Sequence, residues 1–188
     1  VNTMGVSVSA AFAVVNRIDD FAYTPEQNIA HAMTALMAQN KGAGKIDRMK
    51  EGFRCGIILE TIYGILIFII CFALARPLMM MFVKDEEVIG HGVTYLHLIS
   101  VMYLLPALTN GIQGFFRGIG DLKITLISSF INMALRVLAA APLVLIWKMG
   151  IEALPYSYLA GWIGMLVAET PLLLKTYKTW GKKGETPC

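Results

Sequence analysis

Long apolar stretches separated by short polar connections run along the whole chain. The stretches cover residues 6–40, 55–75, 88–116, 124–147 and 153–174. Each is at least as long as the about 20 helical residues that cross the hydrocarbon core of a bilayer. The pattern predicts an all-α, polytopic integral membrane helix bundle of about five transmembrane helices, with the lipid bilayer as its first partner.

Helix-breaking residues punctuate the connections. Gly42 follows the first stretch, Pro77 ends or bends the second, and Gly118 opens the third loop. Glycine closes a helix without strain, and proline pushes the residue before it out of helical geometry. Because the connections are short, we expect consecutive helices to pack antiparallel in one bundle over residues 1–174, followed by a basic cytosolic tail over residues 175–188.

Composition supports the membrane assignment and argues against several classes of function. Apolar residues make up 56% of the chain and charged residues 15%, against roughly 25% charged residues in soluble domains. The mean hydropathy is +0.62. The three cysteines form no CxxC pair and the three histidines no HExxH motif, so we expect no metal site, no cofactor and no enzyme. The net charge of +3 reflects topology, and no nucleic acid partner is expected.

Basic residues are distributed unequally between the two sides of the predicted bundle. Eleven lysines and arginines lie in the first loop, the third loop and the tail, whereas three lie in the connections on the opposite side. Cationic loops are retained in the cytoplasm. We therefore expect a multi-pass protein of the cell membrane whose C-terminus is cytoplasmic.

The first apolar stretch is unusual because a proline and several polar residues interrupt it. Pro25 should kink the helix, since it lacks an N–H group and its ring clashes with the preceding turn. One helix face carries polar residues at spacings of four, four, three and four, namely Asn16, Asp20, Thr24, Gln27 and His31. A charge exposed to lipid costs at least about 2.5 to 3.5 kcal/mol. This face should therefore line a watery cavity or pair with neighbouring helices.

Ten residues are candidates for a substrate or ion pathway because of their polarity and depth. They are Asp19, Asp20, Glu26, Gln27, Asn28 and His31 on the first stretch, Thr109, Asn110 and Gln113 on the third, and Arg136 on the fourth. Simpler interpretations stay open for some of them. Arg17 and Asp20 could form an ion pair, and the polar group after Pro106 could make hydrogen bonds between helices.

Three charged positions outside the first stretch differ in depth. Glu60 and Glu169 are placed close to the membrane interface, where long side chains reach water. Arg136 lies near the centre of its stretch, where an unpaired guanidinium group would be costly. We therefore expect a carboxylate or several carbonyl groups to meet Arg136.

Two longer motifs resemble a known transporter family. The first comprises residues 16–19, NRID, then Pro25 and residues 38–45, AQNKGAGK; the second is residues 116–123, FRGIGDLK. They resemble the second helix with its cytosolic loop, and the loop after the fourth helix, in a lobe of the multidrug and toxic compound extrusion (MATE) transporters. Arg136 falls where the fifth helix of the second lobe often carries an arginine.

The resemblance implies a twelve-helix transporter of two six-helix lobes, of which this chain is the last five helices. Such a transporter exports small organic, often cationic, compounds in exchange for Na⁺ or H⁺ by alternating access, which requires both halves. The partners implied are small organic substrates, the missing N-terminal lobe and the first helix of this lobe. The coupling carboxylates of the family lie in the first helix of either lobe or in the fourth helix of the second lobe, and none can be placed here.

Two other interpretations stay open. A lipid or oligosaccharide-lipid flippase of related architecture would show more cationic charge in its cavity, to meet phosphate groups. A truncated remnant would occupy the membrane or pair with another lobe without transporting.

Overall fold

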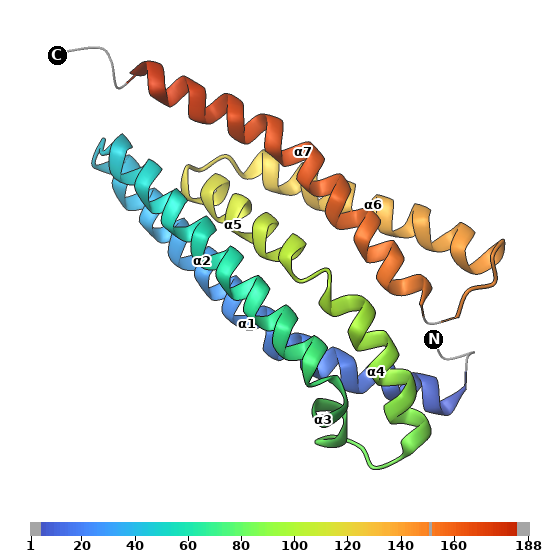
Figure 1. The fold of residues 1–188 in the computed structure, drawn as a ribbon. Coiled ribbons are helices and arrows are strands. Elements are labelled where there is room, and N and C mark those ends of the chain that lie inside the picture. The colour runs from blue at the N-terminus through green and yellow to red at the C-terminus, as the bar shows by residue number, and fades with distance from the viewer. Residues whose placement is uncertain (1–4, 151, 184–188) are drawn as a thin grey trace.

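The computed structural model describes residues 5–150 and 152–183, and its regular structure there is entirely helical. The helices are α1 (Val6–Gly42), α2 (Ile46–Ala73), α3 (Ala75–Met80), α4 (Glu86–Ser100), α5 (Leu104–Gly118), α6 (Leu122–Leu145) and α7 (Ala153–Lys183). Figure 1 shows the long helices running along one elongated bundle, with the short α3 at one end. The predicted all-α fold is confirmed.

Four of the five predicted spans have the length and apolar composition of membrane-crossing segments. Helix α2, helix α6 and residues 153–179 of α7 each qualify alone, and α4 with α5 qualifies as a pair bent by 48°. Helix α1 is the longest helix, with 37 residues, but charged residues interrupt it and it does not qualify among the described helices. Its place as a fifth span stays a prediction.

The outer faces of α2 and α6 are apolar although they are exposed. The exposed side chains are Ile58, Leu59, Ile62, Leu66 and Ile69 on α2, and Leu126, Phe130, Met133 and Val137 on α6. Apolar faces of this extent are rare on water-soluble monomers. Such faces are typical of membrane helices, which expose apolar side chains to lipid or pack them against further membrane helices.

The third predicted span consists of two helices that meet at a bend. Helix α4 ends at Ser100 and α5 begins at Leu104. A tight hydrogen bond from Leu105 N to Met102 O, 2.8 Å long, bridges the break. Pro106 accounts for the break, because it has no N–H group to donate to the carbonyl group of Met102.

Helix α1 continues through its proline. Pro25 lies inside the helix, which ends only at Gly42. The Thr24 hydroxyl group donates to the carbonyl group of Asp20 at 2.6 Å, so a side chain adds a hydrogen bond beside the proline. Continuity through Pro25 is therefore observed, while the kink itself stays a prediction.

The two basic loops lie at the same end of the bundle. Lys41, at the end of α1, donates a hydrogen bond to the carbonyl group of Ile119 in the connection between α5 and α6. Helix α7 also ends there, whereas α3 lies at the opposite end (Figure 1). The structure therefore places these basic segments on one side, as the predicted topology requires.

The last helix is longer than the last predicted span. Helix α7 continues from residue 174 to Lys183, so the first part of the predicted basic tail is helical. Neither glycine nor proline occurs in residues 172–180, and lysines near a helix C-terminus interact favourably with the helix dipole. Residues 184–188 of the predicted tail lie outside the described residues.

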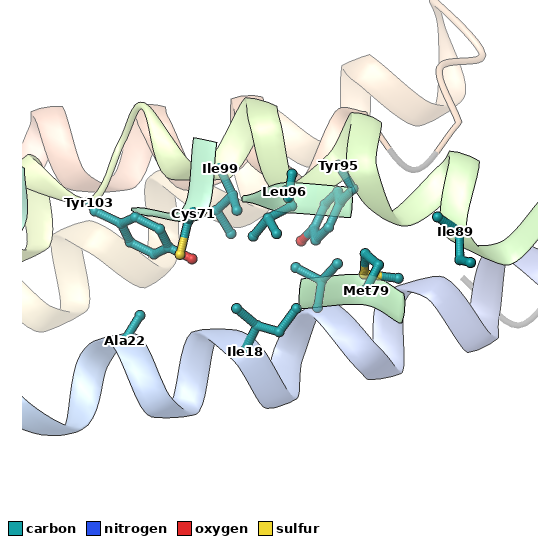
Figure 2. Close-up of a cluster of buried hydrophobic side chains, with 11 residues drawn as sticks. Ile18, Ala22, Cys71, Met79, Ile89, Tyr95, Leu96, Ile99 and Tyr103 are labelled. Atoms are coloured by element: carbon teal, nitrogen blue, oxygen red, sulfur yellow. The ribbon is translucent and has the colours of Figure 1, made fainter. Parts of the chain in front are cut away.

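Two buried apolar clusters hold α1, α2, α4 and α5 together. The larger cluster joins α1 to α4 and to the end of α2, and Figure 2 shows Ile18, Cys71, Tyr95 and Tyr103 among its members. The smaller cluster lies toward the other end and includes Phe115 of α5. These four helices form one closely packed group.

Helices α6 and α7 form a second unit beside this group. A Cβ atom added to Gly161 of α7 would lie 3.0 Å from the carbonyl oxygen of Asn132 in α6, so the two backbones approach closely. Helix α5 contacts both α6 and α7 and joins the pair to the rest of the bundle.

Candidate functional site: a polar cavity between two groups of helices

A cavity of about 450 Å³ opens between the closely packed group and the α6–α7 pair. Its lining comes from α1, α4, α5, α6 and α7, and consists of Asn16, Asp19, Asp20, Tyr23, Gln27, Ile99, Pro106, Asn110, Arg136, Tyr158 and Trp162. Five of the predicted pathway residues are among them, namely Asp19, Asp20, Gln27, Asn110 and Arg136. The structure therefore brings residues from three predicted spans to one polar wall.

Arg136 meets an aromatic ring. Its guanidinium carbon lies 3.8 Å from the centre of the Tyr158 ring, which is cation–π geometry. The described part of the chain gives it no ion pair. A carboxylate or several carbonyl groups were expected from the depth of Arg136. Instead the face of Tyr158 on the adjacent helix attracts the charge, and the cavity gives the guanidinium group access to water.

Asp19 is the most buried acid of the cavity wall. It is 7% exposed and accepts a hydrogen bond from the Tyr103 hydroxyl group. Tyr103 sits at the break between α4 and α5, and its ring packs edge-on against Tyr23 at 5.5 Å between ring centres. Asp19 therefore ties α1 to the bend in the third span.

The alternative pairing of Arg17 with Asp20 is not formed. Both side chains are exposed, and the ion pairs of the described residues are Lys50 with Asp47 and Arg76 with Glu86. Asp20 instead contributes a carboxylate to the cavity wall. The wall thus carries two acids, from Asp19 and Asp20, and one base, from Arg136.

Other predicted pathway residues lie outside the lining of this cavity. Asn28 and His31 are exposed on α1 and do not line the 450 Å³ cavity. Thr109 is buried, and its hydroxyl group donates to the carbonyl group of Pro106 at 3.0 Å. That bond is local to α5. The hydrogen bonds between helices that were considered for this segment are formed by Gln113, which reaches α6 and α7.

Gln113 lines a second, smaller cavity of about 150 Å³ between α5, α6 and α7. Its side-chain amide donates to Ser129 at 3.5 Å and to Glu169 at 3.4 Å. Asn110 and Trp162 line both cavities. The polar wall therefore continues from the larger cavity along α5 to Glu169.

Two acids that were expected to reach water near the membrane interface are buried inside the bundle. Glu60 and Glu169 are both fully buried, with an exposed fraction of 0%. Helix α2 begins at Ile46, inside the predicted first loop, and α7 continues to Lys183, so each acid lies near the middle of its helix. The signal that could have found them is helix length, because the polar turns that flank each apolar stretch are helical as well.

Glu26 also lies away from the cavity. It is 0% exposed and faces α2 and α5, where it is close enough to Glu60 and Asn110 to interact with them electrostatically. Gly111 of α5 lies against the other acid, since a Cβ atom there would be 3.4 Å from Cγ of Glu60. The helix contacts therefore create a buried acid pair that the sequence pattern alone did not reveal.

The chain is similar in sequence to known proteins. A model of the MatE family matches residues 1–141. The chain is 30% identical to the "Probable multidrug resistance protein YoeA" of Bacillus subtilis, over 97% of this chain and 39% of that protein. It is 24% identical to the "Probable multidrug resistance protein NorM" of Thermotoga maritima, over 86% of this chain and 34% of that protein.

A solved structure agrees with the fold. The "Crystal structure of MATE in the bent conformation" superposes with a TM-score of 0.89 at 16% identity, over 96% of this chain and 40% of that chain. At this identity the likeness concerns the fold. The chain spans about two fifths or less of the length of these three proteins.

Proposed function

Because the chain belongs to the MatE family, whose members are transporters, we propose that it is part of a multidrug efflux transporter. The transporter exports small organic, often cationic, compounds in exchange for Na⁺ or H⁺ by alternating access. The observation that supports this proposal best is the 450 Å³ cavity, because its wall combines aromatic rings with acids. An organic cation would find both dispersion contacts and opposite charge on that wall.

The proposed transporter includes helices beyond this chain. Alternating access moves two halves about a central site, and the described helices correspond to about two fifths of the solved transporter fold. We propose that an N-terminal lobe and a first helix of this lobe complete the site opposite Asp20 and Arg136. The C-terminal end of α7 lies on the cytoplasmic side of the cell membrane in this proposal, because the basic segments gather at that end.

The charge of the cavity favours a drug substrate over a phospholipid. A flippase site would need several cations to meet phosphate groups, whereas the wall pairs one arginine with two acids. Asp20 is the exposed acid of the wall and is therefore the group best placed to meet a cationic substrate. Arg136 lies over the Tyr158 ring in the same wall and would position substrate by shape and charge.

Export of a fluorescent organic cation tests the proposal. Cells that produce the complete transporter containing this chain should export the dye faster than vector controls, under an Na⁺ or an H⁺ gradient. Asp20→Asn and Arg136→Met should slow export, because both change the cavity wall. Asp47→Asn, which neutralises a fully exposed acid at the start of α2, is the matched control and should export normally.

Two results would contradict the proposal. Export at the rate of vector controls under both gradients would favour the non-transporting remnant. Normal export by both Asp20→Asn and Arg136→Met would show that the cavity wall does not form the substrate path.

A further inference from the structure

Two buried acids outside the cavity come together between α1 and α2. Glu26 and Glu60 are both 0% exposed. None of their four carboxyl oxygens has a hydrogen-bond partner among the described residues. A buried carboxylate without a partner is strongly unfavourable, and two neighbouring carboxylates repel each other. The pair must therefore bind something that reduces its negative charge.

Helix contacts on either side fix the position of this pair. Toward one end, a Cβ atom added to Gly56 of α2 would lie 2.3 Å from the sulfur of Met33, so the helices are in close contact there. Toward the other end, the Tyr63 hydroxyl group donates to the carbonyl group of Ala22 at 3.1 Å. Glu26 and Glu60 lie between these two contacts, and both α1 and α2 are continuous helices there.

None of the cations that the structure describes neutralises the pair. The titratable groups that interact with Glu26 are Glu60 and Tyr63 on α2 and Tyr23 on α1, and α5 contributes only the neutral amide of Asn110. Within the described residues, ion pairs are confined to Lys50 with Asp47 and Arg76 with Glu86, at the helix ends. The neutralising charge must therefore come from outside the chain.

The surroundings leave little space for a metal ion. Gly111 of α5 packs directly over Glu60. A Cβ atom added to this glycine would already collide with the side chain of Ile57, at 2.7 Å. The part of the chain that the structure describes holds no group of three or more His, Cys, Asp or Glu side chains that could bind a metal ion. A proton needs no such cage, because two carboxyl groups can share it.

We propose that Glu26 and Glu60 bind one proton between them and that this pair is the coupling site of the transporter. The proposal rests on the antiport function proposed above and narrows its coupling ion to H⁺. Uptake of one proton changes the charge of the pair from −2 to −1, and release restores it. A movement of α1 against α2 and α5 would couple this change of charge to the export of substrate.

Asn110 connects the pair with the cavity. Its side chain lies beside Glu26, and it lines both the larger and the smaller cavity. A proton can therefore reach the pair from water in the cavity by passing Asn110. Rotation of this one amide would open or close the path.

Infrared difference spectra test the shared proton directly. The complete transporter, reconstituted in vesicles, is compared at high and low pH, and the C=O stretch of protonated carboxyl groups is followed. Glu26→Gln and Glu60→Gln should each remove the same band, because the proton belongs to both groups. Glu51→Gln, at an exposed acid on α2, is the matched control and should keep the band. Export driven by an H⁺ gradient should fall to the level of vector controls in the two pair variants only.

Several outcomes would overturn the proposal. A band that survives both substitutions, or that only one of them removes, would show that no proton is shared. Removal of the band by Na⁺ at constant pH would assign the pair to Na⁺. If the band behaves as expected but export by Glu26→Gln is normal, the pair is not the coupling site although the antiport function stands. If the unsubstituted protein exports nothing, the proposed function fails, and the spectra still decide whether the pair binds a proton. If Glu60→Gln does not fold, Glu60→Asp takes its place: it keeps the carboxyl group but withdraws it by one methylene group, and the band should shift or disappear.

Discussion

The junction of α1, α2 and α5 and the cavity beside α6 and α7 accommodate polar groups in opposite ways. At the junction, Gly114 brings α5 so close to α1 that an added Cβ atom would lie 2.6 Å from the carbonyl oxygen of Ala30. The acids buried there, Glu26 and Glu60, have no hydrogen-bond partner within the described chain. In the cavity, by contrast, Asp19 and Arg136 each have a tyrosine partner.

The difference shows what close helix packing costs a buried polar group. Small residues let membrane helices approach closely, but they bring no side chain that could donate a hydrogen bond. An open region has room for tyrosine, whose ring and hydroxyl group serve both as apolar filling and as polar partner. We therefore expect the stability of the junction to depend mainly on side-chain volume, and the stability of the cavity wall to depend mainly on which polar groups are present.

The largest effect is expected from adding one methyl group at the junction. Gly114→Ala should destabilise the protein by about 3 kcal/mol, because the atom that it meets belongs to the backbone of α1 and cannot rotate away. Gly90→Ala on α4 is the matched control, since a Cβ atom there meets nothing within 4 Å. It should be neutral or stabilising by about 0.5 to 1 kcal/mol. Thermal unfolding in detergent, followed by circular dichroism, measures both; equal midpoints would contradict the close approach of α1 and α5.

An intermediate effect is expected where the cavity wall meets the bend. Tyr103→Phe removes the hydroxyl group that donates to Asp19. Because this acid is only 7% exposed, the loss of its donor should lower the free energy of unfolding by about 2 kcal/mol. Tyr156→Phe, at a residue 43% exposed on α7, is the control and should cost little. Chemical denaturation in mixed micelles compares the two; a cost no larger than that of the control would show that Asp19 finds another donor.

The smallest effect is expected from exchanging one cation for another. Arg136→Lys keeps the charge but loses the planar group that stacks on Tyr158, so stability should fall by about 0.5 to 1 kcal/mol. Arg136→Met removes the charge as well and sets the upper limit. Unfolding midpoints of the two variants give the comparison. If lysine and methionine cost the same, the charge contributes nothing at this position and stacking accounts for the whole contact.

Sequence analysis predicted the helices well because apolar composition is a local property. The stretches 55–75 and 124–147 correspond to α2 and α6, and the outer faces of both helices carry exposed apolar side chains. Charge counting also placed the loops at Lys41 and Ile119 on one side, where the structure joins them. Each of these inferences needs only neighbouring residues.

The contacts of the site could not be predicted in the same way. Glu60 was expected to reach water because it lies close to the charged first loop, but α2 already begins within that loop, at Ile46, and Glu60 packs against Gly111 of α5. The sequence contains no pattern that pairs Tyr103 with Asp19 or Tyr158 with Arg136. Both contacts depend on how helices far apart in the sequence are placed in space. The ten pathway residues named from polarity stay a prediction until transport is measured.

The bend between α4 and α5 lies beside the cavity. Irregular backbone at membrane depth is tolerated where it is covered by protein or lines an aqueous space. Ile99 and Pro106, which flank the break, both belong to the cavity wall. The break between α4 and α5 therefore lies in the cavity wall itself, so a change in the angle between these two helices would change the shape of the cavity.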